Sequence, residues 1–148
     1  MAHALLMLAV LAVILLMVFQ SEALRVPPTP TRRKVREAVV DLLRPENPAS
    51  IIELGSGWGG MANTLAAAFP EAHITCYERA VIPYLWCRIF ARNPRISFQK
   101  ADIFGADLAK ADAVVCYLSP WHMQKLEAKL DTSMKSGACL VSASFPLS

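Results

Sequence analysis

The chain has 148 residues, a formal net charge of +3 and a hydrophobic fraction of 55%. This length fits one domain, with little left for a second, and the small net charge gives no electrostatic argument for a nucleic-acid partner. The hydrophobic fraction exceeds that of an ordinary soluble domain, and most of the excess lies at the N-terminus.

The first expected element is an uncharged apolar helix. With Ala2 and His3, the run up to Phe19 is about 18 residues, or roughly 27 Å as a helix, at the short end of a bilayer span. We assign residues 1–22 to a transmembrane anchor. A cleaved signal peptide remains an alternative, since residues 21–23 resemble a cleavage site, but no basic residue precedes the run. A buried helix would need polar interruptions, which are absent.

Basic residues after the apolar run set the expected topology. By the positive-inside rule they place the following domain in the cytoplasm, which predicts a single-pass membrane protein. The residues are Arg25, Arg32, Arg33, Lys34 and Arg36.

Residues 23–48 are expected to join the anchor to the main domain. A proline-rich connection, residues 20–31, should be stiff and extended. An amphipathic helix follows, with its basic face either solvated or close to anionic headgroups, and Pro45 and Pro48 end it. Its expected buried face is Val35, Val39, Leu42 and Leu43, and its opposite face carries Arg32, Arg33 and Arg36.

From residue 49 to residue 148, short apolar strands alternate with helices. This alternation predicts a Rossmann-like α/β fold with a mostly parallel sheet. The four cysteines lack the spacing of a zinc site or a disulfide framework, so we expect buried thiols and no metal. The expected strands are 51–54, 73–78, 96–101, 113–118 and 139–145, and the expected helices are 61–69, 83–92 and 120–134.

A glycine turn, residues 55–60, stands between the first strand and a helix. A phosphate-binding P-loop is excluded because Met61 and Ala62 replace its lysine and hydroxyl residue. The GxGxxG pattern of dinucleotide-binding folds is present, with Glu78 as the later acid, so an NAD-binding protein stays open. Glu53, just before the turn, favours a cationic ligand over a pyrophosphate.

The segment from Glu53 to Gly59, ELGSGWG, resembles the first motif of class I methyltransferases, an acid followed by GxGxG. The resemblance implies S-adenosylmethionine as cofactor. It implies that Glu53 lies near the methionine end, that Glu78 accepts from the ribose hydroxyls, and that Asp102 accepts from the adenine amino group. The cofactor-binding residues expected on this basis are Glu53, Gly55, Ser56, Gly57, Gly59, Glu78, Arg79, Asp102 and Ile103.

Several further features resemble the lysine methyltransferases of the ATP synthase c-subunit type and their bacterial relatives. These are the apolar N-terminal segment, Val26–Pro30, Pro83–Arg88 and the Phe145-Pro146 pair, whereas Trp58 stands where relatives often have an acid. The resemblance implies a protein-lysine N-methyltransferase whose substrate lies at the membrane. Such proteins usually have two more strands, so we expect either a truncated sequence or another chain covering the fifth strand's edge.

The expected catalytic group follows the fourth strand: Tyr117, Ser119, Pro120 and Trp121. Methyl transfer requires alignment and exclusion of water more than a strong acid or base. Tyr117 could orient an amine and Trp121 could flank a cation, while His122 is expected on the helix surface. Three functions stay open: methylation of protein lysine, methylation of a lipid or small amphiphile, and a non-catalytic cofactor-binding or scaffold protein.

Overall fold

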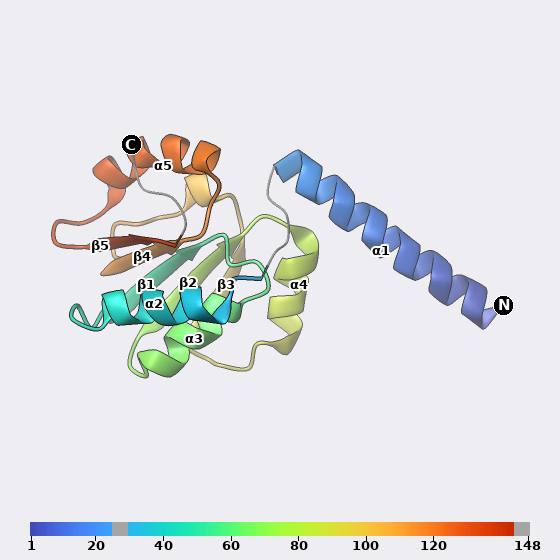
Figure 1. The fold of residues 1–148 in the computed structure, drawn as a ribbon, viewed down its shortest axis with the longest axis horizontal. Coiled ribbons are helices and arrows are strands. Elements are labelled where there is room, and N and C mark those ends of the chain that lie inside the picture. The colour runs from blue at the N-terminus through green and yellow to red at the C-terminus, as the bar shows by residue number, and fades with distance from the viewer. Residues whose placement is uncertain (25–29, 144–148) are drawn as a thin grey trace.

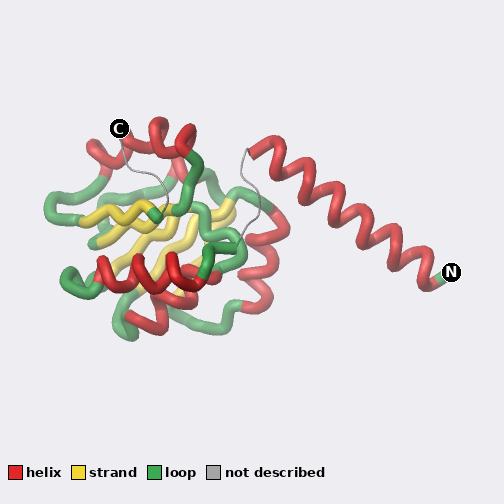
Figure 2. Tube along the Cα trace, viewed as in Figure 1, coloured by secondary structure: helices red, strands yellow, loops and turns green. Residues whose placement is uncertain are grey.

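The computed structural model describes residues 1–24 and 30–143. A long N-terminal helix, α1 (Ala2–Leu24), extends away from an α/β domain in which helices lie on both faces of one sheet (Figures 1 and 2). The remaining elements are α2 (Arg33–Leu43), β1 (Ser50–Leu54), α3 (Gly60–Ala68), β2 (His73–Glu78), α4 (Val81–Phe90), β3 (Ile96–Lys100), the 3₁₀ turn η1 (Ile103–Gly105), β4 (Ala113–Cys116), α5 (Pro120–Ser133) and β5 (Cys139–Ser142).

The five strands are all parallel and stand in the order β3-β2-β1-β4-β5. The chain adds β2 and β3 on one side of β1 and then crosses back to place β4 on the other side. This reversal puts the topological switch point beside the end of β1, where open α/β sheets bind their ligands. The predicted Rossmann-like parallel fold is confirmed.

Two apolar clusters cover the two faces of the sheet. Ile51 belongs to the cluster under α2, α3 and α4, whereas Ile52 and Leu54 belong to the cluster under α5. Successive strand residues point to opposite faces, so β1 supplies both cores. Both faces are therefore buried, which accounts for the continuously apolar sequence of β4.

The buried face of α2 differs from the sequence prediction. Val39, Val40 and Leu43 are buried, whereas Leu42, which was expected inside, is exposed. Arg36, which was expected outside, shares the inner face because it lies three and four residues before the buried valines. Its guanidinium Nη1 donates to the carbonyl of Thr31 at 3.0 Å.

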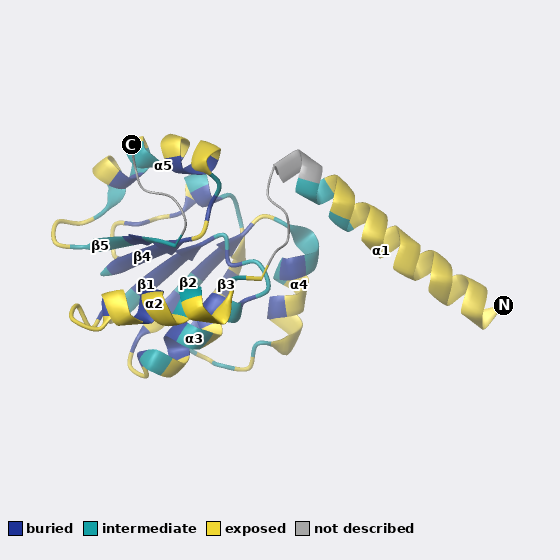
Figure 3. Ribbon diagram, in the orientation of Figure 1, coloured by how far each residue is buried: buried dark blue, intermediate teal, exposed yellow. Residues whose placement is uncertain are grey.

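The apolar helix α1 lies outside both cores (Figure 3). Its segment Ala2–Ser21 has a mean hydropathy of 2.8, and none of it is buried against the described residues. By length and composition it could cross a membrane, and a signal sequence would pass the same test. The helix continues to Leu24, beyond the predicted anchor end at residue 22 and into the predicted extended connection, because no helix breaker precedes Pro27.

Several other element ends also differ from the prediction. β4 ends at Cys116 rather than residue 118, and β5 is described only as far as Ser142. Residues 26–29 of the VPxP segment and the Phe145-Pro146 pair lie outside the described residues. Cys76, Cys87 and Cys116 are buried and Cys139 is partly buried, all as free thiols, as predicted.

Candidate functional site

The glycine turn after β1 depends on backbone conformations that favour glycine. Gly55, Gly57 and Gly59 all have positive φ, at 81°, 51° and 77°. A Cβ added at Gly57 would meet nothing within 4 Å, whereas one at Gly59 would lie 2.9 Å from the sulfur of Cys87. Gly57 therefore borders open space, and Gly59 is required for packing against α4.

Glu78, at the end of β2, ties that strand to the glycine turn. Its Oε2 accepts a 2.7 Å hydrogen bond from the Gly57 amide, and its Oε1 accepts another of 2.7 Å from the Ala80 amide. The side chain is buried. Sequence reasoning placed Glu78 at this strand end, but its contact with the turn depends on the pairing of β1 with β2.

Glu53, in β1, lies buried below the turn with only 5% of its surface exposed. Its pKa is raised to about 8, chiefly by burial, and the nearby charge of Glu78 contributes to this rise. Hydrogen bonds from the Cys76 thiol, at 3.4 Å, and from the Ala62 backbone oppose this rise. A cation placed near Glu53 would favour its ionised form.

Asp102 follows β3 and holds two local contacts. Its Oδ1 accepts from the Phe104 amide at 3.0 Å, which caps η1, and its Oδ2 pairs with Nη1 of Arg79 at 3.0 Å. Arg79 follows β2, so the pairing of β2 with β3 brings these two predicted residues together. Ile103 is buried beside them in the core cluster under α5.

The ends of β1, β2 and β3 thus place three carboxyl groups along one edge of the sheet, next to a turn with open space at Gly57. The buried hydroxyl of Ser56 has no hydrogen-bond partner in the described part of the chain. Buried polar groups are normally paired. Acceptors, an unpaired hydroxyl and exposed backbone together fit a ligand with hydroxyl groups and positive charge.

The segment after β4 is more exposed to solvent than the buried acids Glu53 and Glu78. Tyr117 and Trp121 are 40% and 47% exposed, and Pro120 begins α5. The hydroxyl of Ser119 makes no cap to the helix backbone; its Oγ lies 2.7 Å from Nδ1 of His122. The expected surface position of His122 is wrong, because the first turn of α5 buries its ring, and this burial lowers its pKa.

Three residues that sequence reasoning missed form one cluster with Trp121: His122, Lys125 and Phe104. The Trp121 ring meets His122 edge-on at 4.8 Å between centroids, and His122 lies parallel to Phe104 at 6.3 Å. The ammonium of Lys125 lies 4.7 Å from the Trp121 ring centroid and 5.5 Å from that of Phe104. Lys125 follows Trp121 by one helical turn, a signal in the sequence, but the contribution of Phe104 requires the fold.

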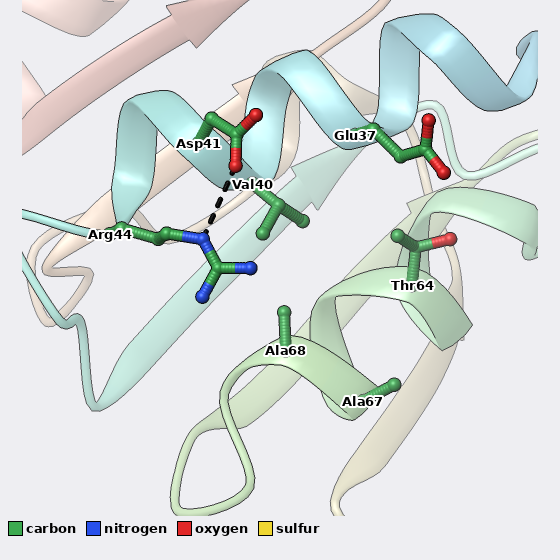
Figure 4. A pocket seen from close by; sticks show the side chains of 7 residues that line it. All are labelled: Glu37, Val40, Asp41, Arg44, Thr64, Ala67 and Ala68. Atoms are coloured by element: carbon green, nitrogen blue, oxygen red, sulfur yellow. Dashed lines mark hydrogen bonds and ion pairs between the residues drawn. The ribbon is translucent and has the colours of Figure 1, made fainter.

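A separate groove lies between α2 and α3 (Figure 4). Arg44, at the end of α2, forms a 3.2 Å ion pair with Asp41 of the same helix. None of the predicted site residues lines this groove, so it does not belong to the site at the strand ends. Its lining residues are Glu37, Val40, Asp41, Arg44, Thr64, Ala67 and Ala68.

Comparison with known proteins identifies relatives of this arrangement. A family model described as the ANTKMT methyltransferase domain matches residues 53–148, which contain the glycine turn and all three carboxylates. A trans-aconitate 2-methyltransferase of Methylobacterium nodulans is 31% identical, over 63% of this chain and 37% of the relative. The chain therefore spans well under half the length of that curated relative.

Solved structures share the fold. An RNA methyltransferase from Salinibacter ruber, in complex with S-adenosyl-L-homocysteine, is 26% identical with a TM-score of 0.71, over 77% of this chain and 76% of that one. An S-adenosylmethionine-dependent methyltransferase from Geobacter sulfurreducens, also bound to S-adenosyl-L-homocysteine, is 20% identical with a TM-score of 0.64. That match covers 77% of this chain and 49% of that one.

Proposed function

This chain belongs to the ANTKMT methyltransferase domain family, and from that premise we propose that it is an S-adenosylmethionine-dependent N-methyltransferase acting on lysine. The observation that carries the proposal is the row of three carboxyl groups around a glycine turn that is open at Gly57. A dinucleotide cofactor is disfavoured because its pyrophosphate would approach the buried acid Glu53.

The strand-end residues fit the cofactor part by part. Glu78 offers a carboxylate beside the turn for ribose hydroxyls, and Ser56 offers a buried hydroxyl that has no hydrogen-bond partner among the described residues. Asp102 offers an acceptor for an adenine amino group, with Ile103 beside it, and Glu53 offers negative charge for the sulfonium end. When bound, S-adenosylmethionine would supply an activated methyl group: an acceptor nitrogen would attack the methyl carbon in line as the carbon–sulfur bond breaks and S-adenosylhomocysteine leaves.

The acceptor would approach over the end of β4. Trp121 and Phe104 already hold the ammonium of Lys125 near their rings, so this surface can bind an alkylammonium group. The attacking amine must be neutral, and a partly apolar, aromatic site lowers an amine's pKa by desolvation. Tyr117 and the Ser119–His122 pair would orient the nitrogen.

Three features support a membrane-associated protein as the substrate. The resemblance to lysine methyltransferases of the ATP synthase c-subunit type favours lysine as the acceptor. The apolar helix α1 is long enough to cross a bilayer, and anchoring would raise the local concentration of a substrate in the same membrane. The basic residues after α1 favour a cytoplasmic catalytic domain.

The test is incubation of the full chain and methyl-labelled cofactor with membranes from cells that lack the protein. We expect label in protein, released as methyllysine on acid hydrolysis. Label in the lipid extract would instead support methylation of a lipid or amphiphile. Cofactor binding without label in any fraction would support a non-catalytic protein and overturn the proposal.

A further inference from the structure

Helix α4 exposes a continuous apolar face. Leu85, Trp86, Ile89 and Phe90 are 47–68% exposed, and at about 100° per residue they span roughly 140° of the helix surface. The opposite side packs inward through Cys87. A patch of two aromatic and two aliphatic side chains on so small a domain indicates an interaction surface.

Helix α4 begins close to the end of α1 (Figure 1). The side-chain oxygen of Gln20, near the end of α1, accepts a 3.0 Å hydrogen bond from the backbone amide of Val81, the first residue of α4. Met17, Gln20 and Ser21 are partly buried, unlike the exposed residues that precede them in α1. The first turn of α4, which precedes the apolar face, therefore lies beside the end of the apolar α1 helix.

Exposed basic residues flank the same region. Arg88 lies on α4 next to the apolar face, and Arg92 follows the end of that helix. Arg32 and Lys34, also exposed, stand at the start of α2, within ten residues of the end of α1. Basic residues close to an anionic membrane surface are attracted to it, and aromatic side chains favour the headgroup level.

We propose that the exposed face of α4 lies in the headgroup region of an anionic lipid bilayer, as a second membrane contact beside α1. The inference rests on the proposed insertion of α1. Aromatic and aliphatic side chains would enter the interface while Arg88 and Arg92 bind lipid phosphates, the arrangement of an interfacial amphipathic helix.

This contact has a consequence for the catalytic site. The Trp86 ring meets Trp58, within the glycine turn, edge-on at 5.9 Å, and the Cys87 thiol donates to the Gly57 carbonyl at 3.4 Å. The lipid-facing helix therefore supports the cofactor turn directly. Docking of α4 fixes the height of that turn above the bilayer and so selects acceptors close to the membrane surface.

The test measures tryptophan quenching by brominated lipid in the full chain, reconstituted into phosphatidylcholine vesicles containing phosphatidylglycerol. A chain carrying W58F and W121F reports on Trp86 alone. A chain carrying W58F and W86F reports on Trp121, a matched control because the two rings are 49% and 47% exposed. We expect quenching of Trp86 to exceed that of Trp121 by about twofold or more, since only Trp86 would lie at the interface.

A second variant isolates the α4 contact. Adding I89E and F90E to the Trp86 reporter should abolish the excess quenching while the chain still floats with vesicles through α1. Leu42→Glu, a charge added at an exposed apolar position on α2, should leave the quenching unchanged. Binding of S-adenosylhomocysteine by each variant confirms that it has folded.

Each remaining outcome overturns the inference. Equal quenching of Trp86 and Trp121 in a chain that floats would refute the α4 contact alone. Protection of Trp86 from both brominated lipid and aqueous iodide would indicate a second copy or another protein on this face. A chain that does not float with vesicles would refute both the α1 anchor and the α4 contact.

Discussion

The cofactor side and the acceptor side of the strand-end edge are built differently. At the ends of β1 and β2, Glu53 and Glu78 are buried and bonded to neighbouring strands or to the glycine turn. After β4, Tyr117 and Trp121 are largely exposed. A cofactor shared by many enzymes can be bound by groups fixed in the sheet. The acceptor would instead be bound by side chains in the loop after β4 and at the start of α5.

Because of this difference, we expect the cofactor side and the acceptor side of the site to respond differently to substitution. Changes on the cofactor side remove buried, charge-assisted hydrogen bonds and should weaken cofactor binding strongly. Changes on the acceptor side should leave cofactor affinity intact and lower the rate of methyl transfer. The comparison fails if both halves show the same response.

The largest effect is expected from Glu78→Gln. The substitution keeps the shape but removes the charge from the acceptor that meets the Gly57 and Ala80 amides. The affinity for S-adenosylhomocysteine should fall about a hundredfold, because hydrogen bonds to charged groups contribute about 1.5–3 kcal/mol each. Calorimetric titration measures it, with exposed Glu71→Gln as the matched control. Equal affinity in the two variants would remove Glu78 from the cofactor site.

A smaller, pH-dependent effect is expected at Glu53. Burial raises its pKa to about 8, so a cationic ligand must bind with release of the proton, and affinity should rise with pH up to about that value. The dissociation constant of the cationic cofactor from Glu53→Gln, divided by its dissociation constant from the native chain, should rise about tenfold from pH 7 to pH 9. This ratio cancels ionisation of the ligand itself. A ratio independent of pH would contradict a role for Glu53 beside the cation.

The free protein provides a complementary check on Glu53. Its pKa in the folded chain, about 8, lies above the group's ordinary value of 4.5, so the stability that the protonated group contributes is complete below pH 4.5. That contribution is lost as the pH rises towards 8, because the unfolded chain releases the proton more readily. Glu53→Gln should remove this loss, as measured by denaturant unfolding across the pH range.

The smallest effect is expected on the acceptor side, from His122→Gln. Nδ1 of the neutral His122 ring lies 2.7 Å from Oγ of Ser119. Loss of this hydrogen bond should lower the methyl-transfer rate about fivefold, which corresponds to about 1 kcal/mol, the usual contribution of one hydrogen bond. Affinity for S-adenosylhomocysteine should not change. The control is His73→Gln, an exposed histidine at the start of β2. A fall in cofactor affinity in His122→Gln would contradict the prediction that acceptor-side residues do not affect cofactor binding.

The sequence determined the local parts of this protein. Strand and helix alternation predicted the parallel sheet, and the resemblance of residues 53–59 to the first motif of class I methyltransferases implied the cofactor, because both depend on residues close together in the sequence. The apolar run up to Phe19 predicted α1. Helix phase and ends were predicted less accurately: Leu42 is exposed and Arg36 lies on the inner face, because an error of one residue rotates a helical side chain by about 100°.

Contacts between residues far apart in the sequence followed only from the tertiary structure. Strand order placed Glu78 against Gly57 and Arg79 against Asp102, and it brought Phe104 to His122. The burial that gives Glu53 a raised pKa, and the contact between Gln20 and Val81, come from packing of elements far apart in the chain. Such contacts leave no local pattern, because they arise from the sum of all the packing interactions rather than from one segment's preference.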